Sequence, residues 1–77
     1  MTVVDVRTPG EFLEGNVPNS INIPLIEVPK SVDQFKEMKQ PIILCCASGI
    51  RSGQAMNFLK SQGIECENAG GWREVHF

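Results

Sequence analysis

Hydrophobic positions along the chain alternate between short apolar runs and stripes of helical spacing. The runs predict β-strands at residues 2–6, 21–23, 42–45 and 64–67. The run at 42–45 is apolar without alternation, which is expected of a central strand covered on both faces. Apolar residues three and four positions apart predict helices over residues 31–39 and 52–62. Pro41 would end the first of these helices, and Gly63 suits the C-terminal cap of the second.

A further, brief helix is predicted directly after the first strand. Thr8 suits its N-cap, Pro9 its first position, and Glu11 can reach back to complete a capping box. Gly15 can end this helix. The alternation of strands and helices predicts an α/β domain with a mainly parallel sheet. In such a sheet the ligand crevice lies beyond the carboxyl ends of the strands, and Cys46 stands there, directly after the central run.

Composition narrows the class of protein. At 77 residues the chain makes one small domain, and an apolar fraction of 42% beside a charged fraction of 21% is typical of a chain that forms a core. Seven basic and nine acidic residues give a net charge of −2, which argues against a nucleic-acid or anionic-membrane binder. No apolar run approaches the roughly 20 residues that span a bilayer. No secretory leader is expected either.

The three cysteines are the candidates for reactive chemistry. Cys45, Cys46 and Cys66 cannot all pair within one chain, and adjacent cysteines are poorly placed to bridge each other. No Cys-x-x-Cys spacing occurs and His76 is the only histidine, so we expect no metal site. A reduced, cytoplasmic protein is therefore expected. Cys45 and Cys66 belong to apolar runs and are expected in the core, with an exposed resolving thiol as the alternative for Cys66.

The segment from Cys46 to Ser52 carries the most specific chemistry. Its small residues predict a loop, and N–H groups that point into this loop would cradle an anion. The positive end of the following helix adds to the same field, so we expect the Cys46 thiol to titrate well below its free pKa of about 8.5. Arg51 is the only cation of the loop, able to bind an anionic substrate or to brace the ring. We expect Ser52 to cap the helix, with a hydrogen bond to the sulfur as the alternative.

Residues 46–51 resemble the active-site loop of rhodanese-homology domains, a family of sulfurtransferases whose signature is a cysteine followed, after four residues, by an arginine. Further segments resemble the family in the expected order, at residues 4–12, 15–24 and 69–72. The resemblance implies a three-layer rhodanese-like α/β fold, in which a mainly parallel sheet is flanked by helices, as a single domain over residues 1–77. Family members usually carry a strand and a helix before the first segment and continue beyond Trp72. We therefore expect some N-terminal and C-terminal family elements to be missing, and an exposed sheet edge that favours self-association.

The activity that the resemblance implies is sulfur transfer. In the family the loop cysteine takes a sulfane sulfur from a donor such as thiosulfate or a protein persulfide, keeps it as a persulfide, and passes it to cyanide or a thiol. By this likeness Cys46 is the nucleophile, and the cradle consists of Ala47, Ser48, Gly49, Ile50 and Arg51. Supporting residues would be Asp5, Arg7 and Ser52. Arg7 is expected to pair with Glu11. No cofactor is implied, and thioredoxin or glutathione is a reasonable thiol acceptor.

Two other functions share parts of this pattern. A cysteine phosphatase or arsenate reductase also uses a cysteine, a loop and an arginine, but normally with one more residue between them and with an acid from elsewhere. A non-catalytic binding module is typical of family members that have lost the cysteine, whereas Cys46 is present. Asn16 stands where the family usually has His, which concerns local hydrogen bonds rather than the nucleophile. Trp72 is expected in the core, with the wall of the pocket as the alternative.

Overall fold

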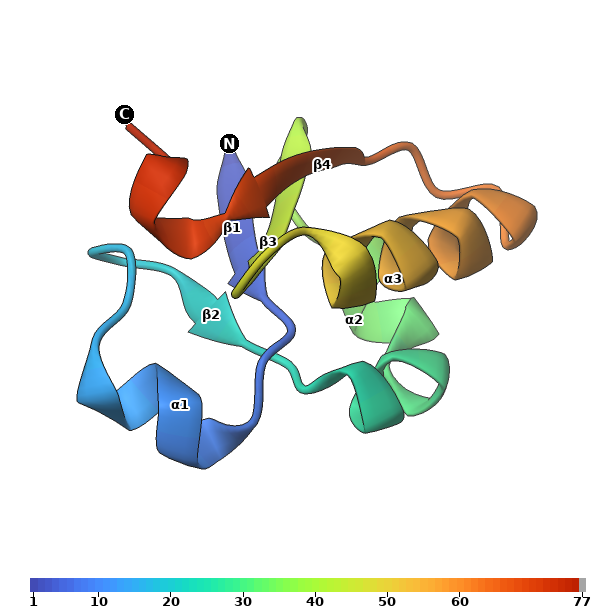
Figure 1. The fold of residues 1–77 in the computed structure, drawn as a ribbon. Helices are drawn as coiled ribbons and strands as arrows, with labels where there is room; N and C mark the ends of the chain where they lie inside the picture. The colour runs from blue at the N-terminus through green and yellow to red at the C-terminus, as the bar shows by residue number, and fades with distance from the viewer. Residues whose placement is uncertain (77) are drawn as a thin grey trace.

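The structure, a computed structural model, describes residues 1–76 and contains a four-stranded, all-parallel sheet (Figure 1). In order across the sheet, its strands are β2 (Ile21–Asn22), β1 (Thr2–Asp5), β3 (Ile42–Cys46) and β4 (Glu67–Gly71). The described helices are α1 (Pro9–Glu14), α2 (Val32–Lys36) and α3 (Ile50–Ser61), with the 3₁₀ helices η1 (Leu25–Lys30) and η2 (Trp72–Glu74). The prediction of an α/β domain with a mainly parallel sheet flanked by helices is confirmed.

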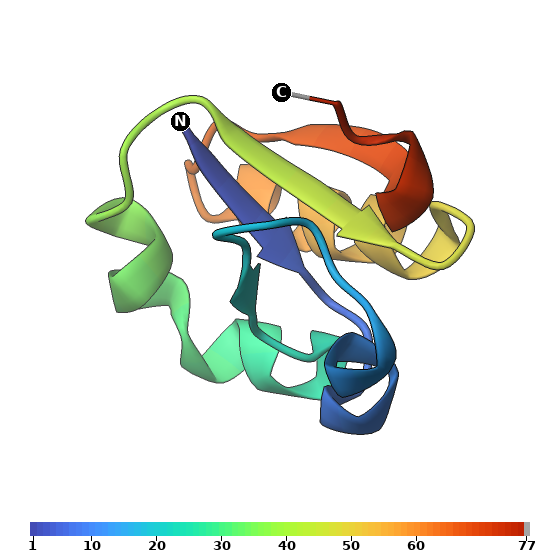
Figure 2. The ribbon, with the colours of Figure 1, turned by 90° about the vertical axis from the view of Figure 1, so that its left-hand side faces the viewer.

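One face of the sheet packs against the helices. Side chains alternate across a strand, and Val4 of β1 and Leu44 of β3 point to this face, where both are fully buried. They belong to one apolar cluster with Phe35 of α2 and Leu59 of α3. Figure 2 shows that α3 lies behind the sheet and covers this face. Each fully buried side chain of this kind stabilises the fold by about 1.5–3 kcal/mol.

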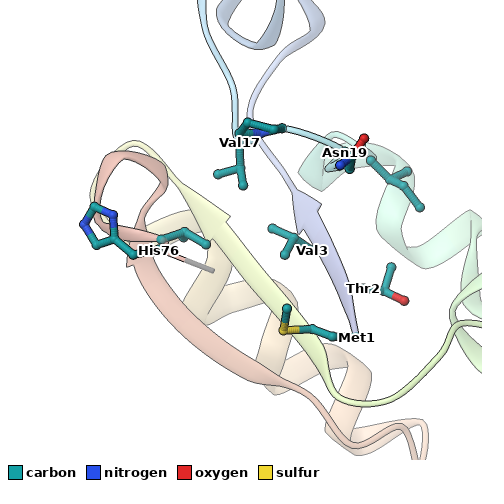
Figure 3. A pocket seen from close by; sticks show the side chains of 9 residues that line it. Met1, Thr2, Val3, Val17, Asn19 and His76 are labelled. Atoms are coloured by element: carbon teal, nitrogen blue, oxygen red, sulfur yellow. The ribbon is translucent and has the colours of Figure 1, made fainter.

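The other face of the sheet carries the alternate residues. Cys45 is fully buried there, whereas Val3 near the start of β1 is only half-buried. A groove of about 840 Å³ lies on this face at the amino ends of the strands (Figure 3). Its lining includes Met1, Val3, Val17, Asn19, Val75 and His76. Figure 1 shows both chain ends on this side of the molecule, away from the carboxyl ends of the strands. No helix of residues 1–76 is long and apolar enough to cross a membrane.

The last strand differs from the prediction. It spans Glu67–Gly71 instead of residues 64–67, so the two glycines expected in a turn belong to the strand. The reason lies at the end of α3, where the Ile64 N–H donates to the carbonyl of Leu59 at 3.0 Å and is therefore still bonded to the helix. Ile64 is buried in the core without pairing to β3.

The helix boundaries also differ from the prediction. The helix expected over residues 31–39 is limited to Val32–Lys36, and the unpredicted 3₁₀ helix η1 precedes it. Pro29 lies inside η1, where its ring would clash with the carbonyl of the preceding turn in an α-helix, and the tighter 3₁₀ helix forms there instead. α3 begins at Ile50, two residues before the expected start, because Gly49 is its N-cap.

Candidate active site

Cys46 is the last residue of β3, and its sulfur lies inside the turn that leads into α3. The residue is only 1% exposed. Its Sγ accepts hydrogen bonds from the N–H of Gly49 at 3.0 Å and the N–H of Ser52 at 3.4 Å, and the Ser52 hydroxyl, which lies 3.3 Å away, can donate a third. The turn therefore surrounds a single sulfur atom with donors, and these donors stabilise a negative charge on it.

The environment of Cys46 lowers the pKa of its thiol. Burial has the largest effect and raises the pKa, because it penalises the charged thiolate. The Ser52 hydroxyl, and the N–H groups of Ser52, Ser48 and Gly49, act in the opposite direction and together outweigh burial. The result is a pKa lowered from 9.0 to about 7. At neutral pH a large fraction of Cys46 is therefore thiolate, as the loop sequence predicts.

The other two cysteines have the opposite character. Burial, and next the charge of Asp5, raise the pKa of Cys45 to about 12. Burial likewise raises the pKa of Cys66. Both are free thiols buried in the protein, which confirms the prediction that they lie in the core. Among three cysteines, the structure gives thiolate character to Cys46 alone.

Glycine at position 49 is required by the shape of the turn. Gly49 has a φ of +100°, a left-handed conformation that other residues adopt only under strain. A Cβ at this position would also lie 3.1 Å from the Cα of Gly70 in β4. The absence of a side chain thus allows the turn to lie against β4 and to direct its N–H groups at the sulfur.

Arg51 braces the loop against α1. Its guanidinium donates to both carboxylate oxygens of Glu11, at 2.7 and 2.9 Å. The same carboxylate accepts from the N–H of Thr8 at 3.1 Å, and the Thr8 hydroxyl accepts from the Glu11 N–H, so the predicted capping box is confirmed. Arg51, followed by the Thr8 contacts, lowers the pKa of Glu11 to about 2. Of the two roles open to Arg51, bracing the ring is the one that the structure shows.

Asp5, at the end of β1, and Arg7 form a buried ion pair. Arg7 Nη2 lies 2.6 Å from Asp5 Oδ2, and both residues are almost fully buried. This hydrogen bond is the main cause of the raised pKa of Arg7. The expected pairing of Arg7 with Glu11 is wrong, because Arg7 reaches only the Glu11 backbone carbonyl, at 3.3 Å. A buried carboxylate such as that of Asp5 is stable only when it is paired with a cation. Arg7 therefore pairs with Asp5 rather than with the carboxylate of Glu11.

Ser52 belongs to the sulfur site and does not cap α3. Gly49 occupies the N-cap position, and the Ser52 hydroxyl contacts the Cys46 sulfur and, at 2.6 Å, the Oδ1 of Asn68. The preferred prediction of a cap is therefore wrong, and the alternative is confirmed. Asn68 was not identified from the sequence. It pairs with Leu44 of β3 directly before a β-bulge, where the register shifts between Leu44 and Cys45, and its place beside the loop depends on this pairing between strands.

A groove of about 350 Å³ adjoins the loop. Its lining includes Arg7, Glu11, Glu14, Ala47, Trp72 and Arg73. The Trp72 ring lies 4.6 Å from the guanidinium carbon of Arg7 and 5.1 Å from that of Arg73. Trp72 is half-buried, so it forms a wall of this groove rather than the expected core anchor. Arg73 was likewise not singled out from the sequence, where no pattern distinguishes it from a solvated surface charge.

The remaining predicted site residues lie around this centre. Ala47 is exposed at the groove, and the Ile50 side chain is 72% exposed. Asn16 donates from Nδ2 to the carbonyl of Phe12 at 2.8 Å and so contributes to the end of α1. His76 is exposed, as predicted. Residues 1–76 contain no group of three or more side chains that could hold a metal ion.

Comparisons with known proteins agree with this geometry. The model of the rhodanese-like domain family matches residues 1–76. The thiosulfate sulfurtransferase PspE of Escherichia coli is 34% identical over 74 residues, which cover 94% of this chain and 71% of that protein. A sulfurtransferase of Allochromatium vinosum is 33% identical over 61 residues, or 79% of this chain. A solved structure of a rhodanese with anions from E. coli superposes with a TM-score of 0.86 at 32% identity, covering 99% of this chain and 92% of that one.

The extent of these matches differs between relatives. The aligned segment spans only 56% of the length of the A. vinosum protein. Within the chain itself the family match reaches both ends of the described residues, and the α/β fold superposes with that of a solved rhodanese. The chain therefore belongs to the rhodanese-like domain family of sulfurtransferases.

Proposed function

We propose that the protein is a rhodanese-type sulfurtransferase that carries a sulfane sulfur as a persulfide on Cys46. The observation that carries this proposal is the single sulfur of Cys46 held among N–H and O–H donors, with a pKa of about 7. A thiolate of this kind is a nucleophile at neutral pH. The relatives named sulfurtransferases support the assignment of the reaction class.

The first step loads the sulfur. With thiosulfate as donor, the Cys46 thiolate attacks the outer sulfur, a new S–S bond forms, and the bond between sulfur and the sulfonate group breaks. Sulfite leaves with that electron pair, so that a thiolate and a thiosulfate dianion become a persulfide anion and a sulfite dianion. The groove beside Ala47 supports this step, because it provides an approach to the loop. A protein persulfide would react in the same way, releasing a thiolate instead of sulfite.

The second step unloads the sulfur. Cyanide or a thiolate attacks the outer sulfur of the persulfide, the S–S bond breaks, and the electron pair returns to the Cys46 sulfur as a thiolate. The charge is again balanced, and neither an oxidant nor a cofactor takes part. Thioredoxin and glutathione are the thiols that we propose as acceptors. The donors around Sγ stabilise the thiolate that leaves in this step.

Phosphate chemistry is less well supported by the same loop. A phosphatase needs the guanidinium of its loop arginine for the equatorial oxygens of the phosphoryl group. Here both terminal nitrogens of Arg51 are bonded to Glu11. The donors converge on a single sulfur atom, which suits a persulfide.

The proposal is tested by weighing the intact protein after incubation with thiosulfate. We expect the native protein to gain the mass of one sulfur atom and to lose it when cyanide is added. Cys46→Ser should gain nothing, whereas the matched variant Cys66→Ala, which removes a buried thiol of raised pKa, should gain as the native protein does. Hydrolysis of an aryl phosphate without any gain in mass would contradict the proposal and support a phosphatase.

A further inference from the structure

Asn68 connects the sulfur-binding turn to β4 through three side-chain hydrogen bonds. Its Oδ1 accepts from the Ser52 hydroxyl at 2.6 Å and from the N–H of Gly70 at 2.9 Å. Its Nδ2 donates to the carbonyl of Gly49 at 3.0 Å. Through Ser52 the side chain is also linked to the Cys46 sulfur, 3.3 Å from the same hydroxyl oxygen.

These contacts fix the orientation of the Asn68 amide. In the opposite orientation the NH₂ group would face the N–H of Gly70, and the amide oxygen would face the carbonyl of Gly49. Both would be unfavourable, since two donors or two acceptors would then face each other. Ser52 therefore meets an oxygen that only accepts, and at 2.6 Å the serine must be the donor.

A serine hydroxyl carries one proton, so it cannot donate to Asn68 and to the sulfur at the same time. When the Ser52 proton lies on the bond to Asn68, the Ser52 oxygen presents lone pairs to the sulfur. This arrangement suits a thiol, whose S–H can donate to Ser52, or a neutral sulfur within a persulfide. A thiolate instead requires the Ser52 proton, and the hydroxyl must then rotate away from Asn68.

We propose that Asn68 is a positioning residue that competes with the Cys46 sulfur for the Ser52 proton, holding it while the sulfur is neutral and releasing it when the sulfur becomes a thiolate. Asn68 thereby stabilises the neutral forms of Sγ, and Ser52 stabilises the charged form. Asn68 and Ser52 together act as a hydrogen-bond switch beside the Cys46 sulfur. It involves no proton transfer, because the proton stays on the Ser52 oxygen throughout.

The catalytic consequence rests on the proposed function. Loading converts the Cys46 thiolate into a persulfide whose Sγ is neutral, so the Ser52 proton turns to Asn68. Unloading restores the thiolate, and the proton turns back to the sulfur. Removal of the amide oxygen should favour the thiolate over the persulfide. It should therefore slow loading relative to unloading.

The test must leave the charges of the titratable groups around Cys46 unchanged. They are Arg51 at the start of α3 with its partner Glu11, the Asp5–Arg7 pair at the end of β1, the neighbouring Cys45, and Glu74 of η2 near Gly71. Substitution of Asn68 by alanine changes none of these charges. A shift in the titration of Cys46 then arises without any change in these charges.

The test measures the absorbance of the Cys46 thiolate against pH, with Cys46→Ser as the baseline. In Asn68→Ala the Ser52 hydroxyl is free to donate to the sulfur, and we expect the pKa of Cys46 to fall by about half to one unit. In Ser52→Ala the hydroxyl is absent, and we expect the pKa to rise. An unchanged or raised pKa in Asn68→Ala overturns the proposal.

A double-mutant cycle separates the switch from a simple distortion of the loop. In the Ser52→Ala background, Asn68→Ala should leave the pKa of Cys46 unchanged, because no hydroxyl remains for Asn68 to hold. The same downward shift in both backgrounds overturns the proposal, since Asn68 would then act through the Gly49 or Gly70 backbone. The titration needs no turnover. A protein that titrates as expected but transfers no sulfur contradicts only the proposed function.

A second variant keeps the proposal testable if circular dichroism shows that Asn68→Ala is unfolded. Asn68→Asp retains the accepting oxygen and adds a negative charge, so it should hold the Ser52 proton more firmly. We expect the pKa of Cys46 to rise more in Asn68→Asp than the same substitution raises it in the Ser52→Ala background, where only the added charge acts. An equal rise in both backgrounds, or a lowered pKa, overturns the proposal.

Discussion

At the scale of single residues, two adjacent cysteines illustrate how position decides chemistry. Cys45 and Cys46 are both almost fully buried, but they point to opposite faces of the sheet. Cys45 lies near the carboxylate of Asp5, and burial and that charge keep it a thiol. Cys46 faces the N–H groups at the start of α3, and they make it a thiolate. Burial alone therefore does not distinguish a structural from a reactive cysteine; the hydrogen-bond donors do.

This difference predicts selective alkylation. The rate of iodoacetamide modification at Cys46 should rise with pH through an inflection near the pKa of about 7 and then level off. Cys45, with a pKa of about 12, should stay unmodified in the folded protein across that range. Peptide mapping by mass spectrometry assigns the modified residue. A folded protein whose Cys46 resists alkylation near neutral pH, or whose inflection lies at 9 or above, would contradict the thiolate assignment.

At this scale the sequence predicted properties that depend on local residues. The lowered pKa of the Cys46 thiol follows from the strand before it and the small residues after it, all of which are local. The partner of Arg7 could not be predicted in the same way, because Asp5 and Glu11 are both near in sequence and only burial distinguishes them. Asn68 is separated from Ser52 by 16 residues, and its role depends on contacts between α3 and β4.

At the scale of elements, α1 shows that a residue predicted to cap a helix can also bind a residue far away in the sequence. Thr8, Pro9 and Glu11 were sufficient to predict the start of the helix, and the capping box forms as expected. The same Glu11 carboxylate also holds Arg51, which is 40 residues away in the sequence. The β-bulge in β4 was not predicted, because a bulge depends on the register with β3 and has no sequence signal of its own. Local caps could thus be predicted, whereas contacts between elements could not.

The link between α1 and the loop predicts a specific acid sensitivity. The folded pKa of Glu11, about 2, lies below its ordinary value of 4.5, so the stability it contributes is present above pH 4.5 and is lost as the pH falls toward 2. In Glu11→Gln the carboxylate is absent, and the melting temperature should fall less between pH 5 and pH 2 than in the native protein. Thermal denaturation followed by circular dichroism measures this difference. Glu14→Gln, which has no ion pair within the described residues, is the matched control. Equal acid sensitivity of the native protein and Glu11→Gln would contradict the prediction.

At the scale of the whole molecule, the two ends of the sheet have different surroundings. The carboxyl ends meet the sulfur-binding turn and the groove of about 350 Å³, and the amino ends meet the groove of about 840 Å³ near both chain ends. The general place of the candidate site was predictable, because parallel sheets place ligands beyond the carboxyl ends of their strands. The groove walls were not, because Trp72 and Arg73 reach the loop only through the path of the chain after β4.

The charge of Arg73 predicts an effect on donor binding. Arg73 is exposed, lines the groove beside Ala47, and has no ion pair within residues 1–76. If thiosulfate approaches through this groove, Arg73→Gln should raise KM for thiosulfate by about two- to fivefold at low salt, with kcat nearly unchanged. Arg73→Lys should restore KM, and Lys60→Gln, at the far end of α3, should not alter it. An equal KM in native protein and Arg73→Gln would show that the donor takes another path.

The exposed sheet edge predicts self-association, which stays a prediction. β2 is an edge strand of only two residues, and its Ile21 is 37% exposed. An exposed edge strand favours pairing with a second copy of the chain. Sedimentation velocity at several protein concentrations should show a mean mass that rises with concentration. A monomer at every concentration would contradict this expectation.

The contact of Trp72 with two guanidinium groups has a practical consequence for testing the proposed reaction. The chain contains one tryptophan and no tyrosine, so its intrinsic fluorescence arises almost entirely from the wall of the groove. A dianion that enters the groove, or a persulfide anion that forms beyond Ala47, alters the electric field on the indole ring. If the proposed sulfur transfer takes place, rapid-mixing experiments on the unlabelled protein should follow the arrival and departure of the transferred atom in real time, with the emission of one native side chain as the signal.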